Sequence, residues 1–394
     1  LGTVGGGVTR VLSRNAGEIS RRAGREIVIT HAAARNLDST TANTTGMKLT
    51  EEALAVVNDP EVSIIVELMG GYEPSRTLVL QALANGKHVV TANKALIAKH
   101  GNEIFATAQA TGMMVGFEAA VAGGIPIIKA IREGLAGNRI EWVAGIINGT
   151  ANFILSEMRD KGRDFPEVLA EAQALGYAEA DPTFDVEGID AAHKLTILAS
   201  IAFGIPLQFD RVYIEGISRI TRQDVAYAEE LGYRIKHLGI ACCNEHGAQL
   251  RVHPTLIPKE QLLASVNGVM NAVLVQADAL GQSLYYGAGA GAEPTASAVV
   301  ADIIDVVRTL TADPDNRVPH LAFQPDALSD LPVLPMTEVE TAYYLRVQAQ
   351  DRPGVLAEVT RILADRNISI EVRTPRGELL FDPVTYSGVS MSRY

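Results

Sequence analysis

The sequence contains little cysteine, few aromatic residues and no excess of positive charge. Its 394 residues include two cysteines, one tryptophan and 5% aromatic residues in all. Because Cys242 and Cys243 are adjacent, they cannot form a long-range disulfide framework or a zinc-binding cluster. We expect both thiols to be buried and inert. This cysteine usage indicates a reducing compartment, and we expect a cytoplasmic protein.

The charge balance excludes several classes of partner. The formal net charge is −12, with 34 lysines and arginines against 46 acidic residues, and there is no basic cluster. We therefore expect no nucleic-acid partner and no binding to anionic membranes. No uninterrupted apolar run approaches the ~20 residues that span a bilayer. The hydrophobic fraction of 47% is that of a globular protein, and the length predicts two or three domains.

The first 118 residues alternate between strand and helix patterns. This alternation predicts an α/β domain with a Rossmann-like, doubly wound parallel sheet. Ligands bind at the carboxyl ends of strands in such a sheet, so Gly70 and Lys94, which follow predicted strands, should lie on the binding edge. We expect helices over residues 8–22, 51–58, 74–85 and 94–111, and strands over residues 25–34, 63–67, 88–91 and 113–118.

The chain opens with a glycine-rich turn, LGTVGGGV. A dinucleotide-binding fingerprint is G-x-G-x-x-G after a buried strand, and residues 1–5 match its last five positions. The first glycine and the preceding strand are missing, so we expect this chain to be a fragment. Thr3 and Val4 would lie at a helix N-terminus, where backbone amides can bind a pyrophosphate.

The end of the second predicted strand bears on the choice of cofactor. A NAD-selective Rossmann fold usually has Asp or Glu there to bind the ribose 2′-hydroxyl, whereas this strand ends in Ala33, Ala34 and Arg35. A guanidinium suits a 2′-phosphate, although Arg35 as a merely solvated side chain is the alternative. We expect NADP to be accepted and preferred, while Asp38 keeps NAD possible.

The pattern is mixed after residue 125, which predicts an α+β substrate domain. Its open sheet could pair subunits, so we expect a homodimer or a higher homo-oligomer. The predicted nucleotide domain covers residues 1–125, and the substrate domain covers residues 126–290. They are followed by a glycine turn with a long helix (291–311), a proline-rich linker (312–340) and a C-terminal segment (341–394). We expect helices over residues 151–161, 190–203 and 222–236, and strands over 142–147, 235–243, 249–254, 271–277 and 283–286.

The most informative segment, residues 176–194, reads GYAEADPTFDVEGIDAAHK. It places five carboxylates within twelve residues, and Pro182 and Gly188 interrupt any helix through them. Apolar residues then follow at helical spacing, so Asp190 should cap this helix or lie in its first turn, with Lys194 one turn on. This arrangement suits a small zwitterionic substrate. The alternative is an acidic loop with a surface ion pair worth about 0.3–0.5 kcal/mol.

This segment resembles the substrate signature of homoserine dehydrogenases, G-[YF]-x-E-x-D-P-x-x-D-x-x-G-x-D-x-x-x-K. Four further motifs follow in the order of that family, and the resemblance covers about residues 1–310. It implies interconversion of L-homoserine and L-aspartate 4-semialdehyde with NAD(P), in threonine, methionine and isoleucine biosynthesis. It also implies that the helix after residue 291 packs back on the nucleotide domain.

The resemblance assigns catalytic roles to three residues. Lys194 matches the proton donor, which becomes the acceptor in the reverse direction, and Lys94 matches a lysine near both nicotinamide and substrate. Asp190 matches an acid at the same centre. An ammonium enclosed in an apolar cleft should titrate lower than in water, which suits a proton shuttle.

The same resemblance assigns substrate-binding residues. Glu179 and Asp190 match acids that bind the substrate's α-ammonium, and Asp185 matches a supporting acid. Thr150 is a candidate donor to the substrate carboxylate, with a plain N-cap role as the alternative. For Asp181, the alternative to substrate binding is a structural role in an Asp-Pro turn. For His193 we expect a core or surface role.

Two further matches concern the cofactor and a metal ion. Gly291, in the GAGAG turn, matches a glycine whose backbone approaches the cofactor. The segment EAAVAGGI, residues 118–125, matches one that binds a monovalent cation, usually sodium. Glu118 would supply the side-chain ligand, and Val121, Gly123 and Ile125 would supply carbonyl oxygens.

Residues 343–371 resemble the opening half of an ACT module, a ferredoxin-like regulatory fold. The resemblance implies threonine as effector, although a complete module needs roughly 30–40 more residues of matching pattern. Two other functions stay open. One is a non-catalytic or truncated amino-acid-binding homologue, and the other is a different Rossmann reductase of the aspartate pathway. Acyl-enzyme chemistry is not expected, because both cysteines lie far from every matched motif.

The cofactor preference is directly testable. We expect higher kcat/KM with NADP than with NAD in parallel assays of one preparation, because Arg35 stands where NAD-selective folds place a carboxylate. A strong preference for NAD would contradict the role given to Arg35.

Overall fold

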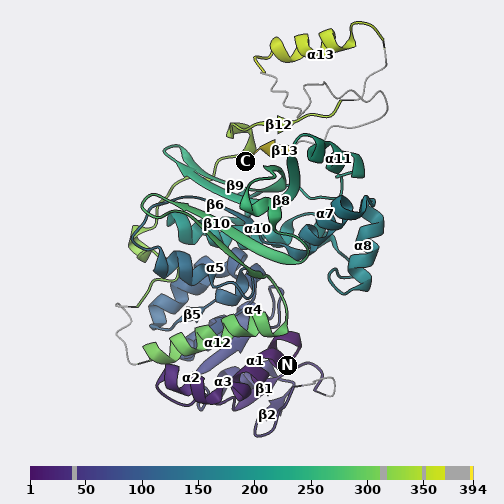
Figure 1. The fold of residues 1–394 in the computed structure, drawn as a ribbon. Helices are drawn as coiled ribbons and strands as arrows, with labels where there is room; N and C mark the ends of the chain where they lie inside the picture. The colour runs from purple at the N-terminus through teal and green to yellow at the C-terminus, as the bar shows by residue number, and fades with distance from the viewer. Residues whose placement is uncertain (38–41, 311–316, 348–351, 369–390, 394) are drawn as a thin grey trace.

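The computed structural model describes residues 1–37, 42–310, 317–347, 352–368 and 391–393. Asp38 and most of the chain after residue 368 lie outside these residues, so expectations for them stay predictions. The nucleotide domain occupies the bottom of Figure 1, a large sheet the middle, and the C-terminal helix the top.

The nucleotide domain is α/β with parallel strands, as its sequence predicts. Three strands form one parallel sheet in the order β3-β4-β5, and β1 pairs with β2. Their bounds are β1 (His31–Ala33), β2 (Lys48–Thr50), β3 (Ile64–Glu67), β4 (His88–Thr91) and β5 (Val115–Gly116), and the helices between them are α3 (Ala53–Asn58), α4 (Ser75–Ala84) and α5 (Lys94–Thr111).

Three local features of this domain differ from the prediction. The expected single sheet is in two pieces, because no described strand joins β1 to β3 and the first helix begins directly after Gly2. The expected helix over residues 8–22 is two helices, α1 (Thr3–Arg14) and α2 (Ala16–Ala23), because Asn15 leaves helical geometry at φ −107° and ψ 17°. The strand expected over 25–34 is reduced to β1.

The substrate domain is built on a mixed sheet with strand order β11-β10-β6-β8-β9-β13-β12, and β7 pairs with β9. Helix α10 packs against β6, β8 and β9. The strands are β6 (Ile140–Ile146), β7 (Tyr213–Ile214), β8 (Tyr233–Asn244), β9 (Gly247–Pro258), β10 (Met270–Ala277) and β11 (Gly281–Ala288); the helices are α6 (Ile127–Lys129), α7 (Gly149–Lys161), α8 (Phe165–Ala174), α9 (Thr183–Val186), α10 (Ile189–Phe203) and α11 (Arg222–Glu230).

The helix expected over residues 222–236 is too long by two turns. Helix α11 ends at Glu230, and Gly232 adopts a left-handed φ of 83°, after which Tyr233 begins β8. A glycine in this conformation ends a helix at little steric cost.

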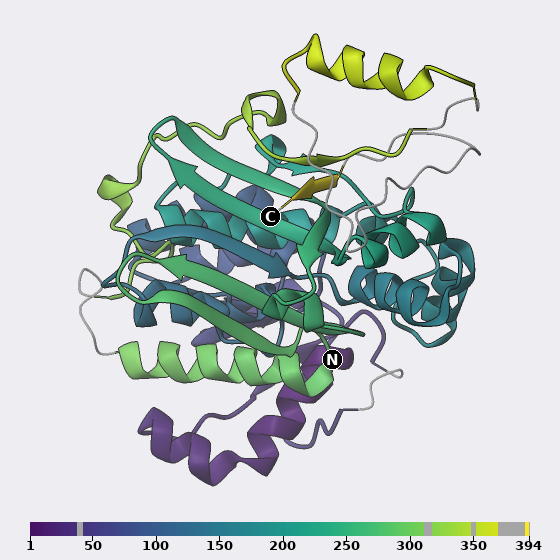
Figure 2. The ribbon, with the colours of Figure 1, turned by 45° about the horizontal axis from the view of Figure 1, so that its top comes forward.

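Helix α12 (Ala292–Thr309) returns to the nucleotide domain, as the resemblance implies. It packs along α1, and the two helices share a core that includes Val8, Ala296 and Val299. Figure 2 shows α12 between the sheet and the first helices. Contact is closest at Gly7, where a Cβ would lie 2.4 Å from the carbonyl oxygen of Ala292.

The segment expected as a linker packs on the catalytic domains over residues 317–334. Leu321 is buried, the ring of Phe323 lies against Gly204, and Val333 forms a β-bridge with Ala248. Leu321 is thereby removed from solvent, whereas Phe323 stays partly exposed at 39%. The C-terminal elements are β12 (Tyr343–Tyr344), α13 (Val355–Ala364) and β13 (Met391–Arg393), and α13 buries none of its residues.

The contact at Gly7 predicts a stability effect. Gly7→Ala should lower the free energy of unfolding by about 1–3 kcal/mol, because the added methyl forces α1 and α12 apart. Gly17→Ala is the control, since a Cβ at this exposed helical position meets nothing within 4 Å. Urea unfolding of both variants checks the prediction, and equal stability for the two would contradict it.

Candidate active site

The centre of the site is a buried carboxylate between two ammonium groups. Asp190 lies in the first turn of α10 and is 4% exposed. Its Oδ1 is 2.9 Å from Lys94 Nζ, and its Oδ2 is 2.6 Å from Lys194 Nζ. The structure therefore brings together the three residues to which the resemblance assigns catalytic roles.

Local structure at both helix starts positions these side chains. Lys94 is the first residue of α5, and Asn93 caps that helix by accepting a hydrogen bond from Leu96 N at 3.1 Å. Gly188 precedes α10 with a left-handed φ of 84°, which turns the chain sharply out of the acidic loop. Helix α10 is buried along most of its length, so Asp190 and Lys194 lie in the interior.

The two lysines differ electrostatically. Burial lowers the pKa of Lys194, although Asp190 opposes this shift. The neighbouring Asp190 raises the pKa of Lys94, which is half-exposed. For Asp190 itself, burial disfavours the ionised form, but the two ammonium groups outweigh burial and hold the pKa well below its usual range. The expected downward shift thus applies to Lys194 and not to Lys94.

Lys194 Nζ has two hydrogen-bond acceptors among the residues that the structure describes. Its Nζ donates to Asp190 Oδ2 and, at 2.7 Å, to the carbonyl oxygen of Ile147 at the end of β6. An ammonium has three N–H groups. The third N–H can therefore serve a further acceptor such as a substrate oxygen.

Sequence reasoning missed Asn148, which joins the acidic residues. Its Nδ2 donates to Asp185 Oδ1 at 2.7 Å and to Asp190 Oδ2 at 2.9 Å. Burial raises the pKa of Asp185, while the hydrogen bond from Asn148 opposes that shift. The signal available in the sequence was the position of Asn148 between a predicted strand and a predicted helix.

The remaining expected substrate residues lie around this centre. Glu179 is exposed in the loop before α9, and its charge contributes to the raised pKa of Lys94. Thr150 Oγ1 donates to the carbonyl oxygen of Tyr177 at 2.6 Å and holds this loop to α7. The N-cap alternative for Thr150 is wrong, because Asn148 caps α7.

Two acidic-loop neighbours are structural, as expected. Asp181 Oδ1 accepts hydrogen bonds from the backbone and hydroxyl of Thr183, which stabilises the Asp-Pro turn. His193 is fully buried and stacks on Phe209, with its Nε2 3.3 Å from the hydroxyl of Tyr72.

The cofactor candidates lie at the carboxyl ends of strands and at helix starts. Thr3 begins α1, whose N-terminus has no side-chain cap, with Val4 next in the chain. Gly70 lies in an exposed turn after β3 with φ 76°, and Gly291 precedes α12 with φ 121°. Arg35 is exposed just beyond β1.

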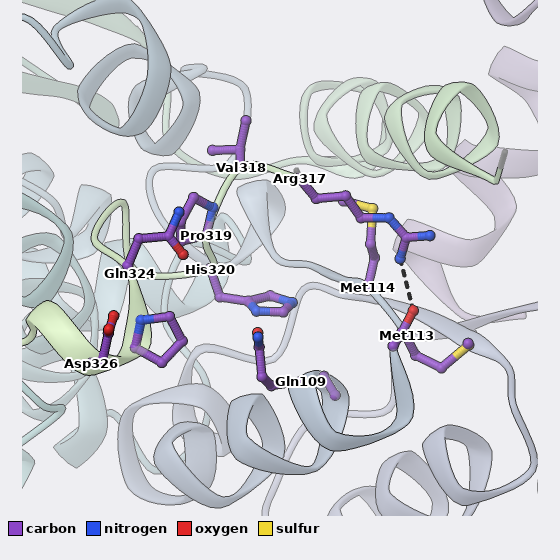
Figure 3. A pocket seen from close by; sticks show the side chains of 12 residues that line it. Gln109, Met113, Met114, Arg317, Val318, Pro319, His320, Gln324 and Asp326 are labelled. Atoms are coloured by element: carbon purple, nitrogen blue, oxygen red, sulfur yellow. Dashed lines mark hydrogen bonds between the residues drawn. The ribbon is translucent and has the colours of Figure 1, made fainter. Parts of the chain in front are cut away.

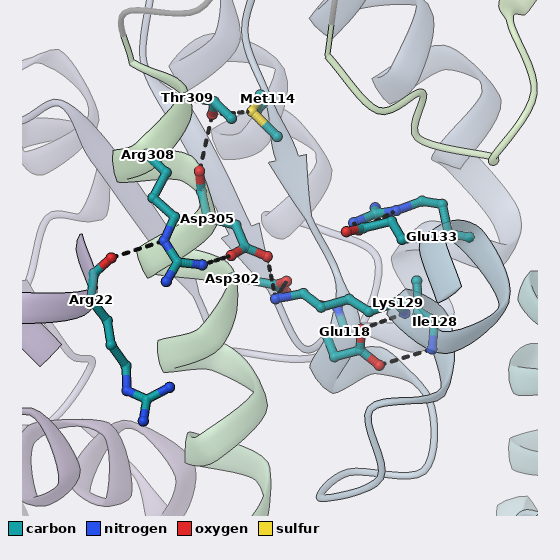
Figure 4. A network of polar contacts seen from close by, with 11 residues as sticks. Arg22, Met114, Glu118, Ile128, Lys129, Glu133, Asp302, Asp305, Arg308 and Thr309 are labelled. Carbon is teal, nitrogen blue, oxygen red and sulfur yellow. Dashed lines mark hydrogen bonds and ion pairs between the residues drawn. The ribbon is translucent and has the colours of Figure 1, made fainter. Parts of the chain in front are cut away.

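The expected cation segment is a buried turn beside α12 (Figure 4). Glu118 is 1% exposed, and its carboxylate accepts hydrogen bonds from the backbone of Ile128 and Lys129 at 2.9 and 2.8 Å. Burial and the nearby Asp302 raise the pKa of Glu118 to about 7. Gly123 has a left-handed φ of 46°. No cluster of three or more metal-binding side chains occurs among the described residues, so carbonyl oxygens would have to complete a site there.

Three other features lie apart from this chemistry. A pocket of about 370 Å³ between the end of α5 and residues 317–326 contains none of the expected site residues (Figure 3).

Cys242 and Cys243 are only partly buried, contrary to the expectation of burial, and burial raises the pKa of both thiols. No helix of the described residues is long and apolar enough to cross a membrane.

Comparison with known proteins decides the family. Residues 126–304 match the family model "Homoserine dehydrogenase", residues 1–118 match "Homoserine dehydrogenase, NAD binding domain", and residues 343–372 match "ACT domain". A homoserine dehydrogenase of Pseudomonas aeruginosa is 69% identical over 94% of this chain and 85% of its own length. The chain belongs to the homoserine dehydrogenase family.

Solved structures of homoserine dehydrogenases share the fold. One from Thiobacillus denitrificans is 71% identical with a TM-score of 0.92, covering 94% of this chain and 86% of that one. A hyperthermophilic archaeal homoserine dehydrogenase in complex with NADPH, 24% identical, has a TM-score of 0.63 over 79% of this chain and 96% of its own. The chain is thus an oxidoreductase of the expected activity, and nothing favours the non-catalytic alternative.

The buried charges at the centre of this homoserine dehydrogenase fold predict a large stability effect. Asp190→Asn should lower the free energy of unfolding by about 3–5 kcal/mol, because it leaves the buried Lys194 without its counter-charge. Asp181→Asn is the control and should change stability little, since an amide oxygen can accept the same hydrogen bonds from Thr183. Equal effects of both substitutions on urea unfolding would contradict the prediction.

Proposed function

We propose that Lys194 is the proton-transferring residue in the oxidation of L-homoserine to L-aspartate 4-semialdehyde. The reaction converts homoserine and NAD(P)⁺ into the semialdehyde, NAD(P)H and one proton. The observation that supports this role is the array Lys94–Asp190–Lys194, in which one buried carboxylate holds both ammonium groups at 2.9 and 2.6 Å.

The electrostatic difference between the lysines supports a division of labour. Lys194 is buried and its pKa is lowered, so it can give up its proton, and then accept the hydroxyl proton of homoserine, more readily than a lysine in water. In the reverse direction it returns that proton to the aldehyde oxygen as negative charge develops there. Lys94, whose pKa is raised by Asp190, stays an ammonium and orients or polarises the substrate.

The carboxylates bind the substrate's ammonium group in this proposal. Glu179 is exposed near Lys94 and Asp185 lies beside Asp190 through Asn148, so both can face a bound amino acid. An α-ammonium that forms charge-assisted hydrogen bonds to them would be held in one orientation. Thr150 already donates to Tyr177, so its hydroxyl would contribute to the substrate site by positioning the loop that carries Glu179.

The cofactor site is proposed at the edge that carries Thr3, Val4, Gly70, Lys94 and Gly291. These residues would hold the dinucleotide, which would supply the hydride acceptor for C4 of homoserine. The uncapped N-terminus of α1 leaves backbone N–H groups to bind the pyrophosphate. The exposed guanidinium of Arg35 beyond β1 supports NADP as the preferred cofactor.

A sodium ion is proposed at the turn after Glu118, with carbonyl oxygens of Val121, Gly123 and Ile125. The donor set fits a hard cation, because the buried Glu118 carboxylate has lone pairs beyond the two that accept backbone N–H groups. Burial and the neighbouring Asp302 raise the pKa of Glu118 to about 7, and a cation beside it would stabilise the ionised carboxylate. The ion would join the nucleotide domain to α6 and have no direct part in proton transfer.

The wider setting is proposed from the family. The enzyme would act in the cytoplasm as a homodimer or higher oligomer formed through the open sheet, in threonine, methionine and isoleucine biosynthesis. The ACT match at residues 343–372 supports regulation by an amino acid, with threonine as the proposed effector.

Substitution of the lysines tests the proposal. Lys194→Met should lower kcat for homoserine oxidation by about 10²–10⁴-fold, the usual contribution of a positioned acid–base group. NADPH affinity, measured by fluorescence titration, should be retained. Lys161→Met, a surface lysine of α7 that pairs with Glu157, is the control. Near-normal turnover of Lys194→Met would show that another group transfers the proton.

A further inference from the structure

Asn148 occupies the junction at which four elements of the site meet. It is the residue after Ile147 at the end of β6 and the N-cap of α7, and it is only 4% exposed. From this position its side chain reaches Asp185 on α9 and Asp190 on α10. No other described side chain hydrogen-bonds to both of these acids.

The hydrogen bonds fix the orientation of the amide. Asn148 Oδ1 accepts from Ala151 N at 2.7 Å, while Nδ2 donates to Asp185 Oδ1 at 2.7 Å and to Asp190 Oδ2 at 2.9 Å. A flipped amide would direct its oxygen at two carboxylates and its NH₂ group at a backbone N–H. Both Nδ2 donors are therefore committed, each to a different acid.

The chemistry of an amide suits this place. Two carboxylates that face the same small volume repel each other, and a shared neutral donor stabilises both without adding charge. A lysine would disturb the charge balance set by Lys94 and Lys194, and a serine would cap α7 but supply one donor at most. The adjacent carbonyl oxygen of Ile147 holds Lys194, so consecutive residues hold both members of the Asp190–Lys194 pair.

We infer that Asn148 is a positioning residue for homoserine oxidation, holding Asp185 and Asp190 in register so that Lys194 presents its remaining N–H to the substrate. This inference rests on the roles proposed above for Asp185, Asp190 and Lys194. It gives α7 a part in the active site through its cap. Small displacements of reacting groups lower the rate of reaction strongly. The positions of Asp185 and Asp190 therefore affect the rate of proton transfer by Lys194.

Two substitutions separate positioning from capping. Asn148→Ser and Asn148→Asp both keep an oxygen that can cap α7, but neither side chain can donate to both acids at once. Asn148→Ser should lower kcat/KM for homoserine by about 10- to 100-fold, the usual effect of lost hydrogen bonds to charged groups. Asn148→Asp, which has nearly the same shape, should lose more than about 100-fold because it places a third carboxylate between the other two.

The measurements are steady-state kinetics with homoserine and with NADP varied in turn, NADPH titration, and the melting temperature. The inference predicts a lower kcat and a higher KM for homoserine, with NADPH affinity unchanged. It is overturned if both variants stay within about threefold of the wild type in kcat/KM, or if NADPH affinity falls in proportion to turnover. Near-normal turnover of Lys194→Met would instead defeat the proposed function, whatever Asn148 does.

Discussion

The structure of the site depends on a single buried carboxylate that lies between two ammonium groups. Asp190 is 4% exposed and contacts Lys94 through one oxygen and Lys194 through the other. An isolated charge in this position would be strongly disfavoured, and the buried charges of Asp190 and Lys194 are tolerated because each has the other as a counter-charge. The array also connects the domains, since Lys94 comes from the nucleotide domain and Asp190 and Lys194 from the substrate domain.

The helix starts and the strand end around this centre are set by local features of the chain. Helix α5 begins at Lys94 under the cap of Asn93, and α10 begins one residue before Asp190, after the left-handed Gly188. The end of β6 provides the Ile147 carbonyl for Lys194 and the Asn148 amide for Asp190. Three chain segments with separate local rules therefore converge on one charged centre, and their helix starts and strand ends deliver its polar groups.

A second buried polar network lies where the two domains join, around Glu118 (Figure 4). Lys129 pairs with Asp305 and lies 3.7 Å from Asp302, whose Oδ2 accepts a hydrogen bond from Glu118 N. Burial raises the pKa of Asp302 to about 6. The network ties the returning α12 to α6. The position of α12 against α1 thus depends on polar contacts at one end and on the close approach at Gly7 at the other.

The sequence by itself determined the class of fold, the helix α5 to the residue, and the family, because strand–helix alternation and the spacing of the acidic segment are local properties of the chain. It also placed Asp190 and Lys194 on one helical face, since i and i+4 are neighbours in any α-helix. Only the tertiary structure decided that Lys94 reaches the same carboxylate and that Asn148 joins Asp185 to Asp190. It also decided that the pKa of Lys94 is raised while that of Lys194 is lowered. Those outcomes depend on burial and on contacts between residues far apart in the chain, and no local pattern encodes the depth at which a side chain will lie. The same reason explains the error at the end of α11, where a left-handed glycine overrode the local pattern, and the packing of residues 317–334, which no local pattern indicated.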